Sequence, residues 1–226
     1  MKRFVILAAA IAGMVQICSA APACAAGTLS SYVSLGSAGC IVGTDTLFNF
    51  QVLPGTAGAT AISPLSVLLS PLSGPSIVGL TSIANVTSSA GSVQESLFTY
   101  QLTGGSYVGS TIILSNSSET GDGASTGLQN FCAGGSFGLD GVSGCTGTPG
   151  ALATVDGAQN QDASLFSAVS FLSVTNDLTF DGGLAGTAAG GTFVNQFTTA
   201  PASIPEPLPL LLTSVGLTLL LCRRVK

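Results

Sequence analysis

The sequence predicts an all-β domain, an antiparallel β-sandwich or jelly-roll-like fold, between an N-terminal signal helix and a C-terminal transmembrane helix. Three observations predict this arrangement. The 226 residues include 30 Gly and only 7 % charged residues, a composition that fits neither a disordered chain nor a helical bundle. Apolar and polar residues alternate in short runs, with no sustained helical period between the two ends. Glycine-rich turn signals separate these runs.

The N-terminus has the order of regions found in secretory signal peptides. Lys2 and Arg3 precede an apolar run over residues 4–17, and small residues follow around Ala20 and Ala25. This order predicts a signal peptide over residues 1–25 and export through the Sec translocon. We expect cleavage after Ala25, with cleavage after Ala20 as the alternative.

A secreted domain is predicted over residues 27–200. Phe48, Phe50 and Val52 are expected on one face of a strand, with Asn49 and Gln51 on the other. Residues 98–103 repeat the alternation. Further short strands are expected at 111–114, 167–174, 178–180 and 192–197, and turns at 54–55, 73–75, 104–105, 121–123 and 181–183.

The segment 121–161 is dense in Gly, Ser and Ala, and we expect long surface loops there. Cys132 and Cys145 enclose part of it, and in an oxidising compartment a disulfide across so short a loop contributes about 3 kcal/mol. Cys40 is left over if the signal peptide ends at Ala25, either unpaired or as a buried free thiol. It can pair with Cys24 if cleavage follows Ala20.

The C-terminus combines three features in order. Pro205, Glu206 and Pro207 lead into an apolar run over residues 208–222, which ends at Arg223 and Arg224. The run is slightly short for a membrane-spanning helix of about 20 residues. The basic end fixes its direction, because positive residues stay in the cytoplasm while the acidic domain crosses.

Residues 204–226 resemble the PEP-CTERM sorting signal of Gram-negative bacteria that make extracellular polysaccharide. The resemblance implies transient anchoring in the inner membrane, recognition by an exosortase-type membrane protease, and release to the cell surface. Pro209 departs from the pattern, because it delays the start of an already short helix. The alternative is an ordinary C-terminal anchor that is never cut.

The central region is similar to acidobacterial-type PEP-CTERM proteins of unknown function. The resemblance implies a shared secreted domain and no known chemistry. It is carried by the paired cysteines and by four short motifs, at residues 40–43 (CIVG), 47–50 (LFNF), 181–183 (DGG) and 194–197 (VNQF).

Charge is distributed unevenly along the chain. All five basic residues lie at the two ends, and no Lys, Arg or His occurs between Phe4 and Cys222. Nine acidic residues lie in that stretch before Glu206. Nucleic-acid binding is excluded, because Lys or Arg must neutralise the phosphates. Such an acidic, Ser/Thr-rich domain is suited to staying hydrated among extracellular polysaccharides.

Catalytic patterns in the sequence are incomplete. Residues 134–138 (GGSFG) match the nucleophile elbow around Ser136, but no His or Lys is present to act as its base. A glycosidase needs two close carboxylates, and nothing in the sequence places Glu95 and Glu119 together. The chain is therefore predicted not to be an enzyme. Most aspartates adjoin Gly or Asn and are interpreted as turn residues: Asp122, Asp140, Asp156, Asp177 and Asp181.

No cofactor is expected, with calcium as the one possibility left open. Asp156, Asn160 and Asp162 are its candidate ligands, because they provide oxygen donors at nearby positions, although the spacing is not that of an EF-hand loop. The predicted function is that of an exported, non-enzymatic cell-surface or extracellular-matrix-associated protein. The alternative is a carbohydrate-binding or adhesive module with a calcium-stabilised loop.

Overall fold

The computed structural model describes residues 21–201. Its only helix in that range is the five-residue α1 (Leu29–Val33), and almost all strand pairs are antiparallel. The predicted all-β class is confirmed, while the jelly-roll description stays a prediction. The strands are β1 (Gly27–Thr28), β2 (Cys40–Val42), β3 (Asp45–Val52), β4 (Thr60–Ala61), β5 (Val67–Gly74), β6 (Ile77–Ala84), β7 (Thr87–Ser89), β8 (Val93–Ser115), β9 (Ser118–Thr120), β10 (Ala124–Ala133), β11 (Thr148–Val155), β12 (Gln161–Asp181), β13 (Thr187–Ala189) and β14 (Thr192–Thr199).

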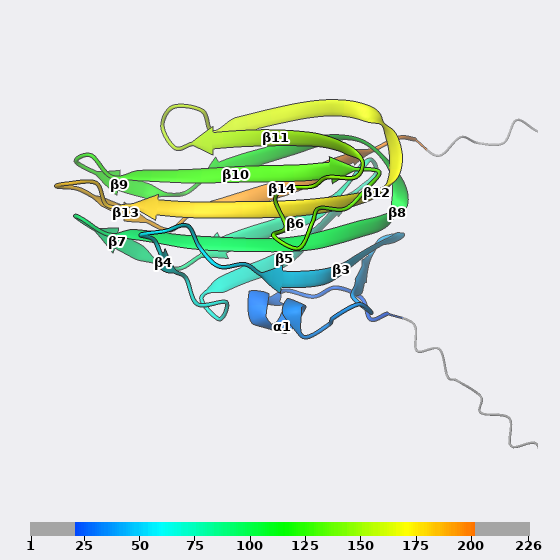
Figure 1. The fold of residues 1–226 in the computed structure, drawn as a ribbon, viewed down its shortest axis with the longest axis horizontal. Helices are drawn as coiled ribbons and strands as arrows, with labels where there is room; N and C mark the ends of the chain where they lie inside the picture. The colour runs from blue at the N-terminus through cyan, green and yellow to red at the C-terminus, as the bar shows by residue number, and fades with distance from the viewer. Residues whose placement is uncertain (1–20, 202–226) are drawn as a thin grey trace, which may run out of the picture.

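The main sheet has eleven strands and folds over into two layers. Strands β3, β8, β12 and β10 form the layer nearer the viewer in Figure 1, and β5, β6 and β14 lie behind it. Strand β8 belongs to both layers, because its first half pairs with β3 and its second half with β14. A small sheet of β7, β13 and β9 lies at the end of the molecule opposite the two ends of the described chain (Figure 1).

Two long strands replace several short ones predicted from the sequence. The expected turn at Gly104 and Gly105 lies inside β8, so that prediction is wrong. Gly104 has φ 113°, and a Cβ there would lie 2.6 Å from the carbonyl oxygen of Thr44. The glycines therefore bend the strand without ending its ladder. Strand β12 has register shifts around Val169, where it pairs with Tyr107 just beyond this bend.

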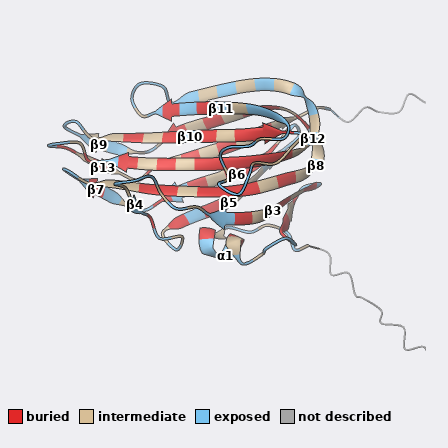
Figure 2. Ribbon diagram, viewed as in Figure 1, coloured by how far each residue is buried: buried red, intermediate tan, exposed pale blue. Residues whose placement is uncertain are grey.

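The core lies between the two layers, where buried and less buried residues alternate along each strand (Figure 2). Phe98, Tyr100 and Leu102 are fully buried, as their alternation predicted. The core also contains a polar chain. The hydroxyl of Tyr100 donates to Oδ1 of Asn195 at 3.0 Å, and the amide of Asn195 donates to Oδ1 of Asn176.

Strand β3 contains a bulge that the sequence pattern did not reveal. Its register with β8 shifts between Phe48 and Gln51, and Asn49 has φ 54°. As a result Phe50 is buried, while Phe48 is half-buried and Val52 is exposed. The expectation that these three residues share one face is wrong, because an extra residue in a strand reverses the alternation beyond it.

The segment 121–161 is more ordered than expected, because β10 and β11 occupy much of it. Only residues 134–147 form a long loop. The small residues that suggested loops have a packing role. A Cβ at Gly150 of β11 would lie 2.1 Å from the ring of Phe131 on β10, so the pairing of these strands requires glycine there.

The described chain is tied into the fold before Gly27. Cys24 is disulfide-bonded to Cys40, and the backbone N–H of Cys24 donates to the carbonyl of Ile41 at 2.8 Å. The N–H of Ile41 donates to the carbonyl of Pro22, also at 2.8 Å. Residues 21–201 contain no helix with the length and apolar character needed to span a membrane. The predicted C-terminal helix and the sorting-motif residues lie outside the described range.

Candidate functional site

A groove lies on the outer face of the front layer, and we call it the outer groove. Its volume is about 320 Å³. One side is formed by sheet residues and the other by the loop 134–147. The lining residues are Asn49, Gln51, Thr99, Gln101, Phe137, Gly138, Leu139, Gly141 and Ser173.

The sheet side of the outer groove depends on strand register. Gln101 of β8 lies between Phe48 of β3 and Ser173 of β12, in one row across the sheet. The bulge in β3 brings Asn49 beside this row, where its Nδ2 donates to Oε1 of Gln101 at 2.6 Å. An amide side chain has two donor hydrogens and an acceptor oxygen. This bond therefore leaves both amides able to bind a ligand.

The other side is held in place by a disulfide and a capped turn. Cys132 and Cys145 are bonded, which confirms the predicted disulfide. Within the loop, the Asp140 carboxylate accepts from the N–H groups of Val142 and Ser143, at 3.1 and 2.9 Å. The Ser143 hydroxyl and these N–H groups lower the pKa of Asp140. The hydroxyl of Thr175 on β12 donates to the carbonyl of Gly141, which fastens the loop to the sheet.

Apolar surface accompanies the amides of the outer groove. Phe137 lines the groove, and the Leu139 side chain is fully exposed beside it. The rings of Phe48 and Phe171 lie 6.4 Å apart between centroids, and Phe171 is opposite Thr103, two residues along β8 from Gln101. The site thus combines flat apolar groups with neutral hydrogen-bonding groups.

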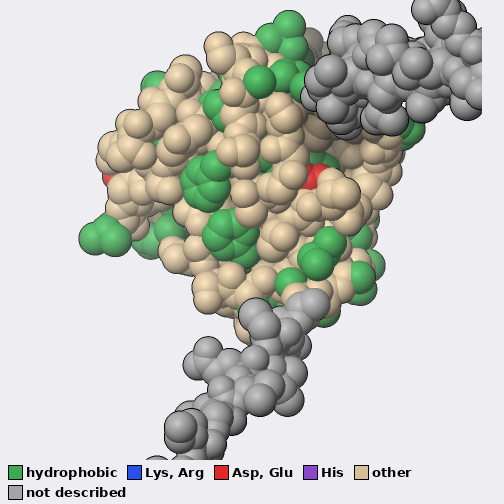
Figure 3. All heavy atoms as spheres, turned by 90° about the vertical axis from the view of Figure 1, so that its right-hand side faces the viewer, with side chains coloured by type: hydrophobic (Ala, Val, Ile, Leu, Met, Phe, Trp, Pro, Cys, Tyr) green, Lys and Arg blue, Asp and Glu red, His purple; other side chains and the backbone are tan. Residues whose placement is uncertain are grey.

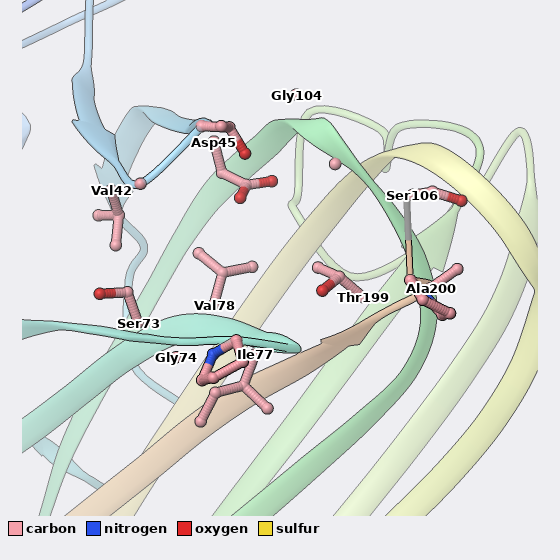
Figure 4. Close-up of a pocket in the computed structure, with 15 residues that line it drawn as sticks. Val42, Asp45, Ser73, Gly74, Ile77, Val78, Gly104, Ser106, Thr199 and Ala200 are labelled. Atoms are coloured by element: carbon pink, nitrogen blue, oxygen red, sulfur yellow. The ribbon is translucent and has the colours of Figure 1, made fainter. Parts of the chain in front are cut away.

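A larger cavity, of about 870 Å³, lies at the end of the molecule where the described chain terminates, and we call it the end cavity. Figure 4 shows side chains of β5, β6 and β14 around it, with Asp45 of β3 on the opposite side. Figure 3 views this end of the molecule and shows apolar side chains among uncharged polar atoms, with only isolated acidic atoms.

The carboxylate of Asp45 is already engaged within the protein. It is buried, and the hydroxyl of Tyr107 donates to its Oδ1 at 2.5 Å. Burial first, and then this bond, raises the pKa of Tyr107 well above its usual range. The lining of the end cavity contains no second acid and no base to share a proton with Asp45.

Among residues 21–201, Glu95 and Glu119 are each paired with an aspartate and not with each other. Glu95 of β8 faces Asp177 of β12, and burial, with a further contribution from Glu95, raises the pKa of Asp177 to about 6. Glu95 is only 2 % exposed, and its Oε2 accepts from the N–H of Thr56 at 2.5 Å. Neither acid lines the outer groove or the end cavity. The second pair joins Glu119 to Asp156.

The predicted turn aspartates have different outcomes. Asp122 accepts from the N–H groups of Leu184 and Ala185, at 2.8 and 2.9 Å, and Asp140 and Asp181 also accept from nearby N–H groups. Asp177 is instead inside β12, so its assignment to a turn is wrong. The neighbouring Asn176 is buried in the polar core, which explains why this Asn-Asp pair does not form a turn.

The candidate calcium ligands lie around the turn from β11 to β12. The Asp162 carboxylate accepts from the N–H groups of Ala153 and Ala163, at 3.0 and 2.8 Å. Asn160 is exposed. Of the three residues, only Asp156 has another acid beside it, Glu119. Residues 21–201 contain no group of three or more His, Cys, Asp and Glu side chains arranged to hold a metal.

The nucleophile-elbow match around Ser136 lies in the disulfide loop. The N–H of Ser136 donates to the hydroxyl of Thr146 at 3.1 Å, and the carbonyl of Ser136 accepts from the N–H of Thr146. A nucleophile elbow requires a strand, a sharp turn and a helix. Strand β10 ends at Ala133, just before the match, but no helix follows Ser136 within residues 134–147.

The sequence alone did not identify the outer groove. Its residues come from three strands and a loop, and their meeting depends on the bulge at Asn49. One available signal was Asn49 itself, a polar residue between two phenylalanines that tolerates the left-handed conformation. The disulfide was the other signal, because it marked the loop that faces these strands.

The comparisons with known proteins identify no family. No protein-family model and no curated protein matches the chain. One solved structure is similar over 61 % of this chain and 90 % of its own, a carbohydrate-binding protein, TmCBM61, in complex with beta-1,4-galactotriose. The identity is 9 % and the TM-score 0.27, values too low to support any inference about this chain.

Proposed function

We propose that this chain is an exported, non-enzymatic surface protein whose β domain binds an uncharged polysaccharide in the outer groove. The observation that carries the proposal is the amide pair of Asn49 and Gln101 beside Phe137. Ligand sites are typically concave, with apolar walls and a few well-placed polar groups. This groove has that composition.

The chemistry of the groove fits sugar hydroxyls. An amide offers a donor and an acceptor close together, which matches two neighbouring hydroxyl groups of a sugar ring. The apolar face of the same ring can pack on a flat aromatic side chain such as Phe137. Gln51 and Ser173 add hydrogen-bonding groups along the floor.

The charge of the domain favours a neutral polymer. Residues 21–201 contain nine acidic side chains and no basic one. An acidic polysaccharide would be repelled by this surface and would find no Lys or Arg to pair with. The lining of the outer groove itself is uncharged. A neutral glucan, galactan or mannan is therefore the expected class of ligand.

Export is supported by the two disulfides and the N-terminal contacts. Disulfides persist in oxidising compartments outside the cytosol. Cleavage after Ala25 would remove Cys24 from its bond with Cys40 and would cut beside the carbonyl of Ala25, which accepts from the Tyr32 hydroxyl at 2.8 Å. Cleavage after Ala20 keeps both contacts. We therefore place the cut after Ala20, in place of the site the sequence favoured.

The C-terminal part of the proposal rests on the sequence. Pro205, Glu206 and Pro207, the apolar run and the terminal Arg223 and Arg224 would hold the domain transiently at the inner membrane until an exosortase-type protease releases it. Only two residues, Ala202 and Ser203, separate Pro201 from the Ile204 that begins this signal. The domain would therefore fold close to the outer leaflet of the inner membrane before release.

The test is binding of the purified full chain to neutral polysaccharides, measured by affinity electrophoresis and calorimetry. Asn49→Gly keeps the left-handed backbone possible but removes the amide, and Gln101→Ala removes its partner. Each should weaken binding about tenfold, because one or two hydrogen bonds to the sugar are lost. Gln159→Ala, at an exposed position outside the groove, is the matched control and should bind normally.

The proposal fails if none of a panel of glucans, galactans and mannans is retained. It also fails if Asn49→Gly and Gln101→Ala bind as well as Gln159→Ala does.

A further inference from the structure

A group of oxygen-bearing side chains lies at the end of the molecule that carries the small sheet. Glu119 is in β9, Ser117 precedes that strand, Ser125 is near the start of β10, and Asp156 follows β11 directly. The backbone connects two of them, because the N–H of Asp156 donates to the carbonyl of Ser125 at 3.0 Å. We call these four residues the Glu119 cluster.

Three oxygen atoms of the Glu119 cluster are buried without a hydrogen-bond partner. They are Oγ of Ser117, Oγ of Ser125 and Oε1 of Glu119, out of five such side-chain atoms among residues 21–201. Ser125 is only 1 % exposed. Buried polar atoms are nearly always paired, and an exception indicates a water or an ion at the site.

The two acids of the cluster lie within hydrogen-bonding range of each other. Burial raises the pKa of Glu119, and the neighbouring Asp156 raises it further, although the nearby serines oppose this. The contact with Glu119 lowers the pKa of Asp156. Two adjacent carboxylates need either a shared proton or a cation. No Lys, Arg or His is available anywhere in residues 21–201 to supply the positive charge.

We propose that the Glu119 cluster binds a calcium ion through the carboxylates of Glu119 and Asp156 and the hydroxyls of Ser117 and Ser125. Calcium takes six to eight oxygen ligands in flexible geometry, so water completes the shell. Magnesium fits less well, because it demands a rigid octahedron and gives up its waters reluctantly. With two carboxylates, an affinity of about 10⁻⁴ to 10⁻³ M is expected, the range of extracellular calcium modules.

The ion would join parts of the chain that are distant in sequence. Strand β9 belongs to the small sheet, where Glu119 pairs with Ala188 of β13. Ser125 and Asp156 belong to the edge of the main sheet, where Thr126 of β10 pairs with Val155 of β11. A bound calcium would therefore fasten the small sheet to the main one. This role is separate from the outer groove, which lies on different residues.

The test compares thermal unfolding of the full chain, purified in a mild detergent, with 5 mM CaCl2, 5 mM MgCl2 or EDTA at pH 7.5. Calcium at about ten times its Kd should raise the Tm by about 3 °C, and magnesium by less. The double variant Glu119→Gln/Asp156→Asn keeps the size of both side chains and should lose the calcium response. Asp162→Asn, the neighbouring acid that bonds to backbone, should keep it.

A second measurement, calorimetric titration with CaCl2, should give one site per chain in wild type and in Asp162→Asn. The proposal is overturned if calcium leaves both the Tm and the calorimetric signal of wild type unchanged, in which case the acids share a proton. It is also overturned if the double variant, folded by circular dichroism, still binds calcium with wild-type affinity.

Discussion

Cys24 is bonded to Cys40, and this bond ties the first described residues to β2 and, through it, to β3. The segment 21–26 is therefore joined to the folded domain. Its loss would also remove the partner of the Ile41 backbone. This disulfide can form only if the exported chain begins before Cys24.

Cys24→Ser should destabilise the domain by about 3 kcal/mol, since the bond closes a loop of 16 residues in the unfolded chain. The measurement is urea unfolding under non-reducing conditions. Addition of a reductant should lower the stability of wild type further than that of the variant, because only wild type still contains both bonds. Equal stability of the variant and wild type would contradict the assignment.

The buried chain of Tyr100, Asn195 and Asn176 should show strong coupling. Asn195→Ala leaves the Tyr100 hydroxyl and the Asn176 oxygen without partners, which should cost about 2–4 kcal/mol. The double variant Tyr100→Phe/Asn195→Ala should lose less than the sum of the two single changes, because the orphaned hydroxyl is gone. Additive losses in a double-mutant cycle would argue against the network.

Asp177 should make the domain less stable as pH rises. Its pKa in the fold is raised to about 6 from 3.8, so the folded state holds a proton that the unfolded state has released between these values. Stability should therefore fall from about pH 4 to pH 6 and then level off, with an effect on the order of 1 kcal/mol after solvent screening.

Asp177→Asn is the variant that isolates this effect in urea unfolding across that pH range. It should remove most of the decline and be more stable than wild type at pH 7.5. Glu119, whose pKa is also raised, contributes in the same direction and remains in both proteins. A decline in the variant as steep as that of wild type, or steeper, would contradict the raised pKa of Asp177.

The disulfide loop should support binding as well as stability. Cys132→Ser/Cys145→Ser should lose about 3 kcal/mol of stability. It should also weaken retention on a neutral polysaccharide, because Phe137 and Gly141 would no longer be held against the sheet. Affinity electrophoresis at a temperature where the variant is still folded separates the two effects. Unchanged retention would place the ligand away from this loop.

The sequence predicted those features that depend on local pattern. Alternation identified the buried face of β8 at Phe98, Tyr100 and Leu102, and spacing within a loop identified the disulfide of Cys132 and Cys145. The turns predicted at 73–75 and 121–123 were also found, at residues 75–76 and 121–122, since Gly and Pro between short strands are local signals.

The features that sequence reasoning missed depend on contacts between distant segments. A glycine at position 104 bends β8 instead of ending it, because the ladder with β12 continues beyond the bend. Gly150 makes the sequence of β11 resemble a loop. A glycine is needed at this position because the Phe131 ring lies against it. The bulge at Asn49, and with it the outer groove, is defined by register with β8. No pattern within one segment specifies that register.

The central claim is that the chain functions after export, with its domain beginning at Ala21 and both disulfides formed. Intact-mass measurement of the protein recovered from the cell surface and medium tests it most directly. We predict an N-terminus at Ala21, a C-terminus near Pro205, and a mass about four protons below that of the reduced chain. An intact chain from Met1 to Lys226 with free thiols would contradict the claim, and an N-terminus at Ala26 would refute the proposed cleavage after Ala20.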